Sequence, residues 1–471
     1  MLDCFHREWK ARMIGSSERR MMCTLFVLSV FAGSLAYGQV VTGTILGSVT
    51  DATGAVLAGA TIQIQNLDTG FSRTEQTDRE GRYISRSLPL GAYSVTVQQQ
   101  GFRTDERRGI TLTVASEVTV NVELSVGNVQ DRVEVTGEAP VIETSNGTVS
   151  KLITGDQIRD LPLNGRSLDG LAGLTPGLFV DRSGNPNASL GFGSRLSING
   201  SRVDSILYLL DGTVINDPSG GAPISASKNM LGVEGILEFR LLTHNFSAEY
   251  GRNSGAVMSS VTRSGTNQFH GSLYEFLRNN VFDARNFFNP GDLPPFRRNQ
   301  FGGSVGGPVI KDRLFFFANY EGLRERQGVP VNISVPGENA RKGLLPCTIA
   351  PAGSPCNTAT RLAQVPVNPE ALPFVSLFPQ PNGVSNGDGT AQYTTSFNAK
   401  SNENYNMYRM DYRISAKDSL YMRYVYNTAN RLSARPVPIW GERAETAPHF
   451  VVFSETHVFS GTTLKPTYAW L

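Results

Sequence analysis

Short apolar runs, each ended by Gly, Asn or Asp, dominate the pattern of hydrophobic and polar positions between residues 196 and 265. Ile206–Leu210, for example, is followed directly by Asp211-Gly212. Because turn residues recur so often, short strands are the favoured elements here. Two short helices are predicted just before this stretch, one over Thr154–Leu161 that ends at Pro162 and one over Leu168–Leu174. Together these elements predict a small α+β domain.

A different pattern precedes it, between Gly43 and about Val126. The run Ala60–Ile64 alternates apolar and polar residues with the period of a half-buried strand, and Val118 to Leu124 repeats that alternation. Tight turns such as Thr77–Gly81 separate the strands. About seven strands in about 85 residues fit a Greek-key β-sandwich, which we place at residues 39–127.

The last two hundred or so residues read as antiparallel strands. Tyr408, Met410 and Tyr412 fall on one face of a strand, while Arg409 and Asp411 fall on the other. The return strand, after a turn at Ser415–Asp418, places Met422 and Tyr424 opposite Arg423. Strands of nine or ten residues with one apolar face fit a transmembrane β-barrel, although a soluble hairpin would show the same alternation. The long connection from about Val329 to Ala399 is predicted to lie outside the cell.

The N-terminus has the pattern of an export signal. Arg19 and Arg20 precede an apolar run from Leu25, and small residues flank a cleavage site before Gln39. The run is shorter than the roughly 20 residues that a membrane-spanning helix needs, so a removed signal peptide at 1–38 is favoured over an anchor or a buried first helix. Translation could also start at Met13, Met21 or Met22.

The α+β segment resembles the plug domain of TonB-dependent outer-membrane receptors of the Oar-like kind. The residues that carry the resemblance are Leu210-Asp211-Gly212, Val233–Ile236, Glu249–Gly255 and Val261–Asn267, in that order. The resemblance implies a plug at 141–266, the first part of an outer-membrane β-barrel at 267–471, and sandwich and linker in the periplasm of a Gram-negative cell. The expected fold class is therefore mainly β.

The sandwich resembles the carboxypeptidase regulatory-like domain, a carbohydrate-binding-like fold. The matching positions are Gly47, Asp51, Gly54, Gly59, Ala60, Asp78, Gly81, Tyr83, Gly91, Tyr93, Gly101 and Phe102. Turns and core packing explain these residues better than ligand binding, because a sugar site needs exposed aromatic rings. Whether the sandwich binds anything is left open.

A linker at 128–140 contains the extended run Val133, Glu134, Val135 and Thr136. In the family that the chain resembles, a segment between the export signal and the plug pairs with the energy-transducing protein TonB, and this run is similar to that TonB box. The physical basis would be β-augmentation, in which an extended peptide adds a strand to a partner sheet. The alternative, a strand that only belongs to the linker, stays open.

Cysteine usage agrees with an exported chain. Of the four cysteines, Cys347 and Cys356 are the two that remain after the leader is removed. In an oxidising compartment they predict a loop disulfide. A metal site is not predicted, because two thiolates without a nearby His do not complete a tetrahedral shell.

Nothing in the sequence favours an enzyme. The five His residues are scattered, and no Gly-x-Ser-x-Gly or Walker-type motif occurs. The run Gly302–Gly307 leads into Pro308 and a strand rather than a helix N-terminus, so it does not predict a phosphate site. No catalytic residue, cofactor or metal is therefore predicted, and a net charge of +2 gives no reason to expect a nucleic-acid partner.

The function that follows from the resemblance is TonB-dependent uptake through a plugged barrel. The expected partners are TonB, outer-membrane lipid and an unidentified extracellular ligand, for which a carbohydrate or a peptide are candidates. The alternative is a secreted or surface adhesin whose sandwich binds carbohydrate. Large plugged barrels use about 22 strands, and six to eight candidates after Asn267 are too few, so we expect an incomplete barrel that forms a curved, open sheet.

Overall fold

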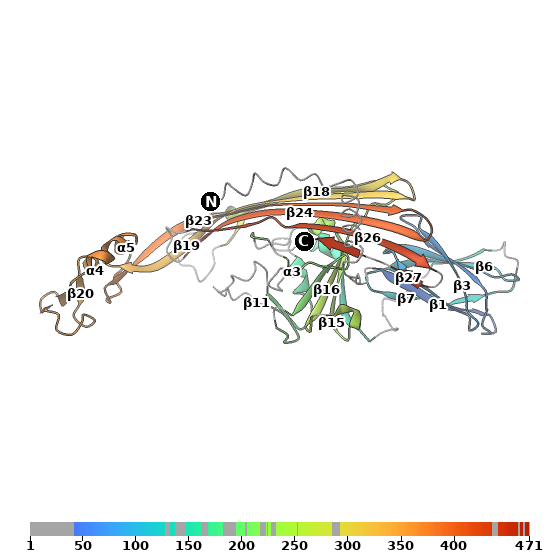
Figure 1. Cartoon of the computed structure of the whole chain (residues 1–471), viewed down its shortest axis with the longest axis horizontal. Coiled ribbons are helices and arrows are strands. Elements are labelled where there is room, and N and C mark those ends of the chain that lie inside the picture. Colours follow the sequence, from blue (N-terminus) through green and yellow to red (C-terminus); the bar gives the residue numbers. More distant parts are fainter. Residues whose placement is uncertain are drawn as a thin grey trace, which may run out of the picture.

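The computed structural model has three parts that follow one another along the chain: a β-sandwich, a small mixed domain that we call the plug, and a long antiparallel sheet that we call the wall (Figure 1). The predicted signal peptide lies outside the described residues. The described residues are 42–127, 132–136, 147–161, 168–181, 195–202, 205–216, 223, 225–227, 232–251, 253–284, 293–435, 441–459, 462–464 and 467–470.

The sandwich has the predicted two-sheet architecture. Its core is filled by alternate residues of facing strands, and Ile62, Ile64 and Val95 are fully buried. One sheet contains β1 (Gly43–Asp51), β4 (Arg82–Leu88), β7 (Glu117–Thr119) and β8 (Val122–Leu124). The other has the order β3 (Ser72–Gln76), β2 (Thr61–Asn66), β5 (Gly91–Gln98), β6 (Thr104–Leu112) and β9 (Arg132–Thr136).

The plug is built on a five-stranded sheet in which β13 and β16 run parallel and β10 forms one edge. Helix α2 (Gly155–Asp160) follows the prediction closely, because Thr154 and Gln157 form a capping box at its start. The sheet order is β10 (Val149–Thr154), β15 (Ile236–His244), β16 (Ala256–Thr262), β13 (Ile206–Leu210) and β14 (Thr213–Val214). The remaining plug elements are α3 (Leu168–Ala172), β11 (Leu178–Asp181), β12 (Arg195–Ile198), η1 (Val233–Gly235) and η2 (Ala248–Tyr250).

The wall is an antiparallel sheet with two open ends in the described part of the chain, because β17 and β27 terminate the order of its strands. It lies along one side of the plug and is curved, as Figure 1 shows. Its strands are β17 (His270–Asn279), β18 (Phe296–Ile310), β19 (Leu314–Pro336), β23 (Thr390–Arg413), β24 (Asp418–Ala434), β25 (Gly441–Thr446), β26 (His449–Phe459), β27 (Thr462–Leu464) and β28 (Thr467–Trp470), and η3 (Asn280–Phe282) follows β17. The expected open sheet is thus confirmed.

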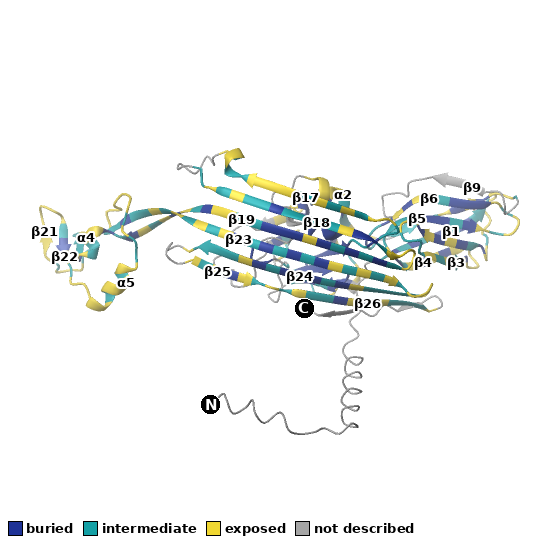
Figure 2. Cartoon of the chain, turned by 90° about the horizontal axis from the view of Figure 1, so that it is seen from above, coloured by how far each residue is buried: buried dark blue, intermediate teal, exposed yellow. Residues whose placement is uncertain are grey.

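The two faces of the wall differ as the alternation predicted. In Figure 2 buried and exposed residues alternate along β23 and β24. Tyr408, Met410 and Met422 are exposed on the outer face, whereas Arg423 is fully buried on the face that meets the plug. The apolar outer face is what lipid selects.

The predicted strand length of nine or ten residues is wrong for the centre of the wall. Strands β19 and β23 contain 23 and 24 residues and pair without a break from Leu314 and Tyr412 to Pro336 and Thr390. The prolines in this extension suggested a loop, but pairing with β18 ends at Gln327. Pro330 and Pro336 therefore lie where β19 has one neighbour, which is where a strand tolerates proline.

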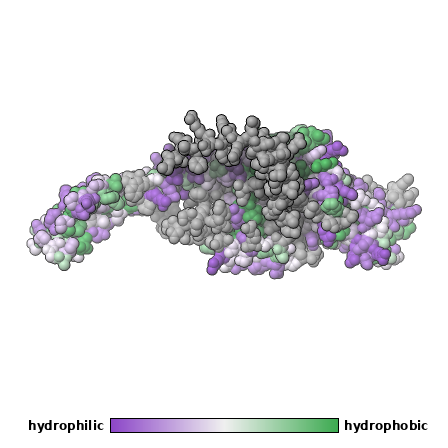
Figure 3. Space-filling view, viewed as in Figure 1, coloured by the Kyte–Doolittle hydropathy of each residue, from purple (hydrophilic) through white to green (hydrophobic). Residues whose placement is uncertain are grey.

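The connection between β19 and β23 is also shorter and more ordered than predicted. It spans residues 337–389 rather than 329–399 and forms a small module at the far end of the hairpin (Figure 1). In the space-filling view this module mixes polar and apolar surface (Figure 3). Its elements are α4 (Glu338–Arg341), β20 (Leu344–Pro346), β21 (Cys356–Asn357), β22 (Leu362–Gln364), η4 (Pro369–Ala371) and α5 (Leu372–Ser376).

The helices of the described part of the chain are all short. None of them is long and apolar enough to cross a membrane.

Candidate functional site

The contact between plug and wall centres on the hairpin turn that joins β13 to β14. Asp211 and Gly212 both have positive φ, 49° and 77°, as a two-residue Asp-Gly turn requires. The carboxylate of Asp211 accepts hydrogen bonds from the backbone N–H of Thr262 at 2.9 Å and from its hydroxyl at 2.8 Å. The turn therefore fixes one ionised group at the tip of the plug sheet.

Two arginines from the wall meet this carboxylate. Arg423 of β24 forms an ion pair with Asp211, and Nη1 of Arg409 of β23 lies 3.3 Å from its Oδ1. Burial would raise the pKa of Asp211, but the two guanidinium groups and the hydrogen bonds from Thr262 outweigh it and hold that pKa below its usual value. Asp211 and Arg423 are 2% and 0% exposed. The pair is thus a fully desolvated link between plug and wall.

Further groups neutralise the second arginine. Nη2 of Arg409 lies 2.7 Å from Asp411, so two carboxylates face two guanidinium groups. The ring of Tyr421 lies under the Arg409 guanidinium at 4.8 Å, and its hydroxyl donates to the carbonyl of Asp211 at 3.0 Å. Buried ion pairs are stable only when their charges are matched in this way. We call Asp211, Arg409, Arg423 and Asp411 the charge cluster.

Two more wall carboxylates hold backbone and hydroxyl groups of the plug. Glu321 of β19 accepts from the backbone N–H of Gly232 at 2.9 Å. Glu403 of β23 accepts from the hydroxyl of Ser227 and from the amide of Asn427. Both carboxylates are fully buried. The inner face of the wall thus binds the plug through these two carboxylates as well as through the charge cluster.

A smaller contact joins the plug to the sandwich. The backbone N–H of Val114 donates to the carboxylate of Glu238, and Nη2 of Arg240 donates to the hydroxyl of Thr113 at 3.1 Å. Burial raises the pKa of Glu238 to about 7, and the Val114 bond and Arg240 oppose that rise only in part. This contact therefore contains a group that titrates near neutral pH.

The sandwich also contacts one end of the wall. Nη1 of Arg413 donates to the carbonyl of Gly70 at 3.1 Å, and the N–H of Asn267 donates to the carbonyl of Asp68 at 3.0 Å. The side chain of Asn267 is held in turn by Asp312 at 2.7 Å. These bonds place the sandwich at the ends of the wall strands opposite the module.

The four residues of the candidate TonB box, Val133 to Thr136, belong to strand β9. This strand pairs in parallel with β6 of the sandwich, with Asp105 beside Val133 and Arg108 beside Thr136. It is the last strand of its sheet in the described part of the chain. The structure therefore places the box at a sheet edge, which neither of the two sequence interpretations foresaw.

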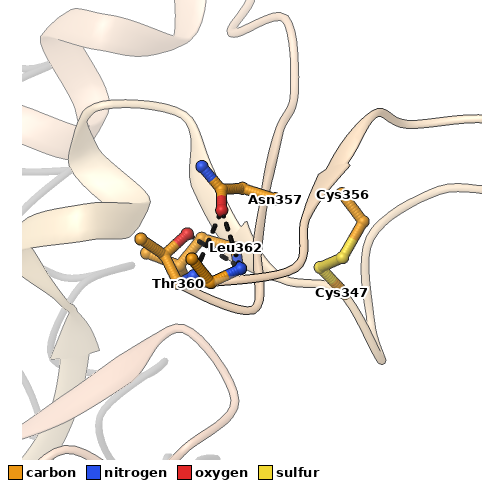
Figure 4. Close-up of a disulfide and its surroundings, with 6 residues drawn as sticks. Cys347, Cys356, Asn357, Thr360 and Leu362 are labelled. Atoms are coloured by element: carbon orange, nitrogen blue, oxygen red, sulfur yellow. Dashed lines mark hydrogen bonds between the residues drawn. A yellow bond between two sulfur atoms is a disulfide. The ribbon is translucent and has the colours of Figure 1, made fainter.

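Cys347 and Cys356 form a disulfide in the module, with their Cα atoms 5.7 Å apart (Figure 4). Beside it, the side chain of Asn357 accepts from the backbone N–H of Thr360 at 3.2 Å. Within the residues that the structure describes, no three His, Cys, Asp or Glu side chains gather as metal ligands would.

Sequence reasoning missed the charge cluster. Asp211 was recognised as a turn residue and Arg409 and Arg423 as charges on an inner face, but their meeting requires the plug to lie against the wall. An available signal was the placement of two arginines on the lumen face of adjacent strands, where they need a carboxylate. The sequence alone does not say which carboxylate supplies it.

Three family models match successive parts of the chain. They are the carboxypeptidase regulatory-like domain over residues 44–125, the TonB-dependent receptor plug domain over residues 141–257, and the outer membrane beta barrel domain over residues 261–468. The resemblances drawn from the sequence are thereby confirmed.

The chain is also similar to individual proteins. It is 30% identical over 305 residues to the TonB-dependent transporter Oar of Myxococcus xanthus, and the alignment covers 61% of this chain and 27% of that protein. The outer membrane transporter YddB of Escherichia coli shares 12% identity and a TM-score of 0.43, covering 68% of this chain and 38% of that one. The ferric enterobactin receptor of Pseudomonas aeruginosa shares 12% identity and a TM-score of 0.41, covering 68% and 40%. The chain thus spans about a quarter of the curated relative that it matches.

Proposed function

The chain belongs to the TonB-dependent receptors of the outer membrane, and on that premise we propose that it binds an extracellular ligand and gates its energy-coupled uptake. In this role the chain performs no chemistry on the ligand. It recognises the ligand at the outer end of the wall and controls passage beside the plug.

The observation that carries this proposal is the charge cluster. It links the turn of the plug to the inner face of the wall through a buried carboxylate and two arginines. Removing one partner from such a cluster leaves an uncompensated buried charge, which costs about 3–5 kcal/mol. A plug held in this way stays closed until work is done on it.

The work would enter from the N-terminal side. A pull on β9 reaches β10 next along the chain, and β10 is an edge strand whose partner in the plug sheet is β15. An edge strand can leave its sheet without opening the strands behind it. We therefore propose that TonB acts on residues 133–136 and that β10 is the first plug element to move.

The test is a proline substitution in the box of a complete homologue, at the position of Val135. Val135→Pro removes a backbone donor and fixes φ, so it should abolish pairing with TonB while leaving surface expression intact. Val135→Ala is the matched control, because it shortens the same side chain and keeps the N–H. Energy-dependent accumulation is measured over a panel of oligosaccharides, peptides and metal chelates.

Accumulation of a ligand by the parent and the alanine variant, with loss in the proline variant, supports the proposal. Unchanged uptake in the proline variant contradicts the box assignment. A parent that accumulates no ligand more than a TonB-deficient strain contradicts uptake itself.

A further inference from the structure

We propose that the sandwich presents β9 as a ready-made strand, and that the sheet edge of TonB adds to the outer side of β9 while β9 stays paired with β6. This proposal rests on the proposed function and deepens it. It assigns the sandwich a role in partner binding, as the support of the docking strand.

The position of β9 is the first observation. The strand is paired with β6 in continuous parallel register from Thr104 and Arg132 to Arg108 and Thr136. The chain arrives there along the same part of the sandwich, because the N–H of Arg103 donates to the carbonyl of Ser125 at 2.9 Å and the N–H of Gly127 to that of Gly101 at 3.2 Å. Residues 125–127 thus bond to residues 101–103, and β9 pairs with the residues that follow directly, 104–108.

The second observation is the free edge. Among the strands that the structure describes, β9 pairs with β6 and with no other strand. The five residues Arg132–Thr136 contain no Pro, Gly or Lys, and the pairing shows no register shift. An unpaired strand edge is a template for another strand, and β9 has no Pro or bulge to block pairing, although Arg132 and Glu134 are charged.

The third observation concerns β6 itself. Asp105 and Glu106 are buried, although they lie at the start of the strand next to β9. Arg107 and Arg108 each bond to one of these carboxylates, at 2.7 and 2.8 Å. The buried carboxylates next to β9 are thus paired within β6, and β6 is itself held in the sandwich by antiparallel pairing with β5.

An ordered strand is a better partner than a flexible peptide. A flexible segment loses conformational freedom when it joins a sheet, and this loss weakens binding. Because β9 is already paired with β6, it has lost this conformational freedom before TonB binds. In the competing mechanism, β9 must leave β6 before TonB can bind. The apparent affinity is then lower than the intrinsic affinity, because only the chains with a detached β9 can bind.

A disulfide clamp separates the two mechanisms. Arg108→Cys and Thr136→Cys change paired positions, and adjacent strands lie about 4.8 Å apart, within the Cα separation of a disulfide. The full chain is purified in detergent, and its affinity for the periplasmic domain of the host TonB is measured with the clamp oxidised and reduced. The unchanged chain under both conditions controls for the native disulfide, and Arg108→Cys alone controls for the lost ion pair. Binding is measured rather than uptake, because the clamp also changes how a pull reaches the plug.

If β9 binds while attached, the oxidised clamp keeps a Kd within about threefold of the reduced form, since the competent fraction does not fall. An affinity loss of about 100-fold on oxidation, reversed by reduction, overturns the proposal in favour of detachment. An unchanged chain that does not bind the TonB domain at all overturns the proposed function together with this inference.

A proline scan provides a second readout that does not depend on cysteine chemistry. Successive N–H groups of a strand point to opposite edges. Pro at Val133 or Val135 should therefore weaken TonB binding, whereas Pro at Glu134 should loosen β9 from β6, seen as faster hydrogen exchange in β6. A variant that loosens β9 and binds TonB more tightly than the parent contradicts the proposal.

Discussion

The plug meets the wall and the sandwich through contacts of different kinds. Toward the wall it uses a buried carboxylate between two arginines, with Glu321 and Glu403 of the wall holding further plug groups. Toward the sandwich it uses Glu238 and Arg240, which bond a backbone N–H and a hydroxyl group. The first contact matches charge with charge, and the second sets a carboxyl against a backbone N–H.

This difference separates a firm contact from an adjustable one. The pKa of Asp211 is lowered, so the charge cluster stays ionised near neutral pH. The pKa of Glu238 is raised to about 7, so its charge changes within that range. The plug–wall contact therefore keeps its charges near neutral pH, whereas the plug–sandwich contact changes by one charge there.

The largest effect is expected from Asp211→Asn. The amide keeps the shape of the side chain but leaves Arg423 buried without its counter-ion, which should cost about 3–5 kcal/mol. Hydrogen exchange in β13 and β16 should become faster, and the melting temperature should fall.

The matched control is Asp156→Asn in the same domain. Asp156 pairs with Arg159 at 2.9 Å, but its side chain is 82% exposed. Exposed pairs contribute about 0–1 kcal/mol, so this variant should behave almost like the parent. Equal effects of the two substitutions would show that burial of the cluster does not hold the plug.

Gly70→Ala should weaken the sandwich on its other side, against the wall. Gly70 has φ +66°, and an added Cβ would lie 2.3 Å from Oδ1 of Asp312, which holds Asn267. Backbone strain and loss of that hydrogen bond should together cost about 2 kcal/mol. Faster hydrogen exchange of the turn at 311–312 is the measurement.

Gly54→Ala separates the effect of backbone strain from the effect of the steric clash with Asp312. Gly54 also has positive φ, +84°, but nothing lies within 4 Å of its added Cβ. This variant should lose about 1 kcal/mol of sandwich stability through strain and leave exchange at 311–312 unchanged. If Gly54→Ala also speeds exchange at that turn, the wall contact of Gly70 is not the cause.

Glu238→Gln should change the pH dependence of the adjustable contact. The folded pKa of Glu238, about 7, lies above the model-compound value of 4.5, so the folded chain binds the proton more tightly. Stability from this group is present at low pH and is lost as pH rises from about 4.5 through about 7. Glutamine does not titrate, so the variant should be more stable than the parent at pH 8, by up to about 3 kcal/mol for a pKa raised from 4.5 to about 7, and similar to it at pH 4.5.

The melting temperatures of parent and variant at both pH values measure this difference. Glu80→Gln, at an exposed sandwich residue paired with Arg82, is the control and should change neither value. A stability difference between Glu238→Gln and the parent that does not depend on pH would contradict the titration of Glu238.

The strands and helices could largely be predicted from local sequence patterns, whereas the contacts between sandwich, plug and wall could not. Alternation placed Arg423 on the inner face of β24 and Met422 on the outer face, and the Asp211-Gly212 turn was visible in two residues. Nothing local says that Asp211 meets Arg423, which lies more than two hundred positions later.

The outer half of the β19–β23 hairpin was missed for a related reason. Beyond Gln327, β19 no longer has β18 as a neighbour and contains Pro330 and Pro336, so its sequence is that of a loop, while backbone pairing with β23 continues to Pro336 and Thr390. The pairing of β9 with β6 was equally invisible, because the register of a parallel strand is set by its partner rather than by its own pattern.

The smallest effect on both plug contacts is expected from Cys347→Ser with Cys356→Ser. The disulfide closes a loop of nine residues in the module, remote from the plug. Its loss should destabilise the module by less than about 3 kcal/mol and leave hydrogen exchange in β13 and β15 unchanged. In the native chain, the two cysteines should react with thiol reagents only after reduction. Free labelling of the native chain would contradict the disulfide, and faster exchange in the plug of the serine variant would show that the module and the plug are coupled along β19 and β23.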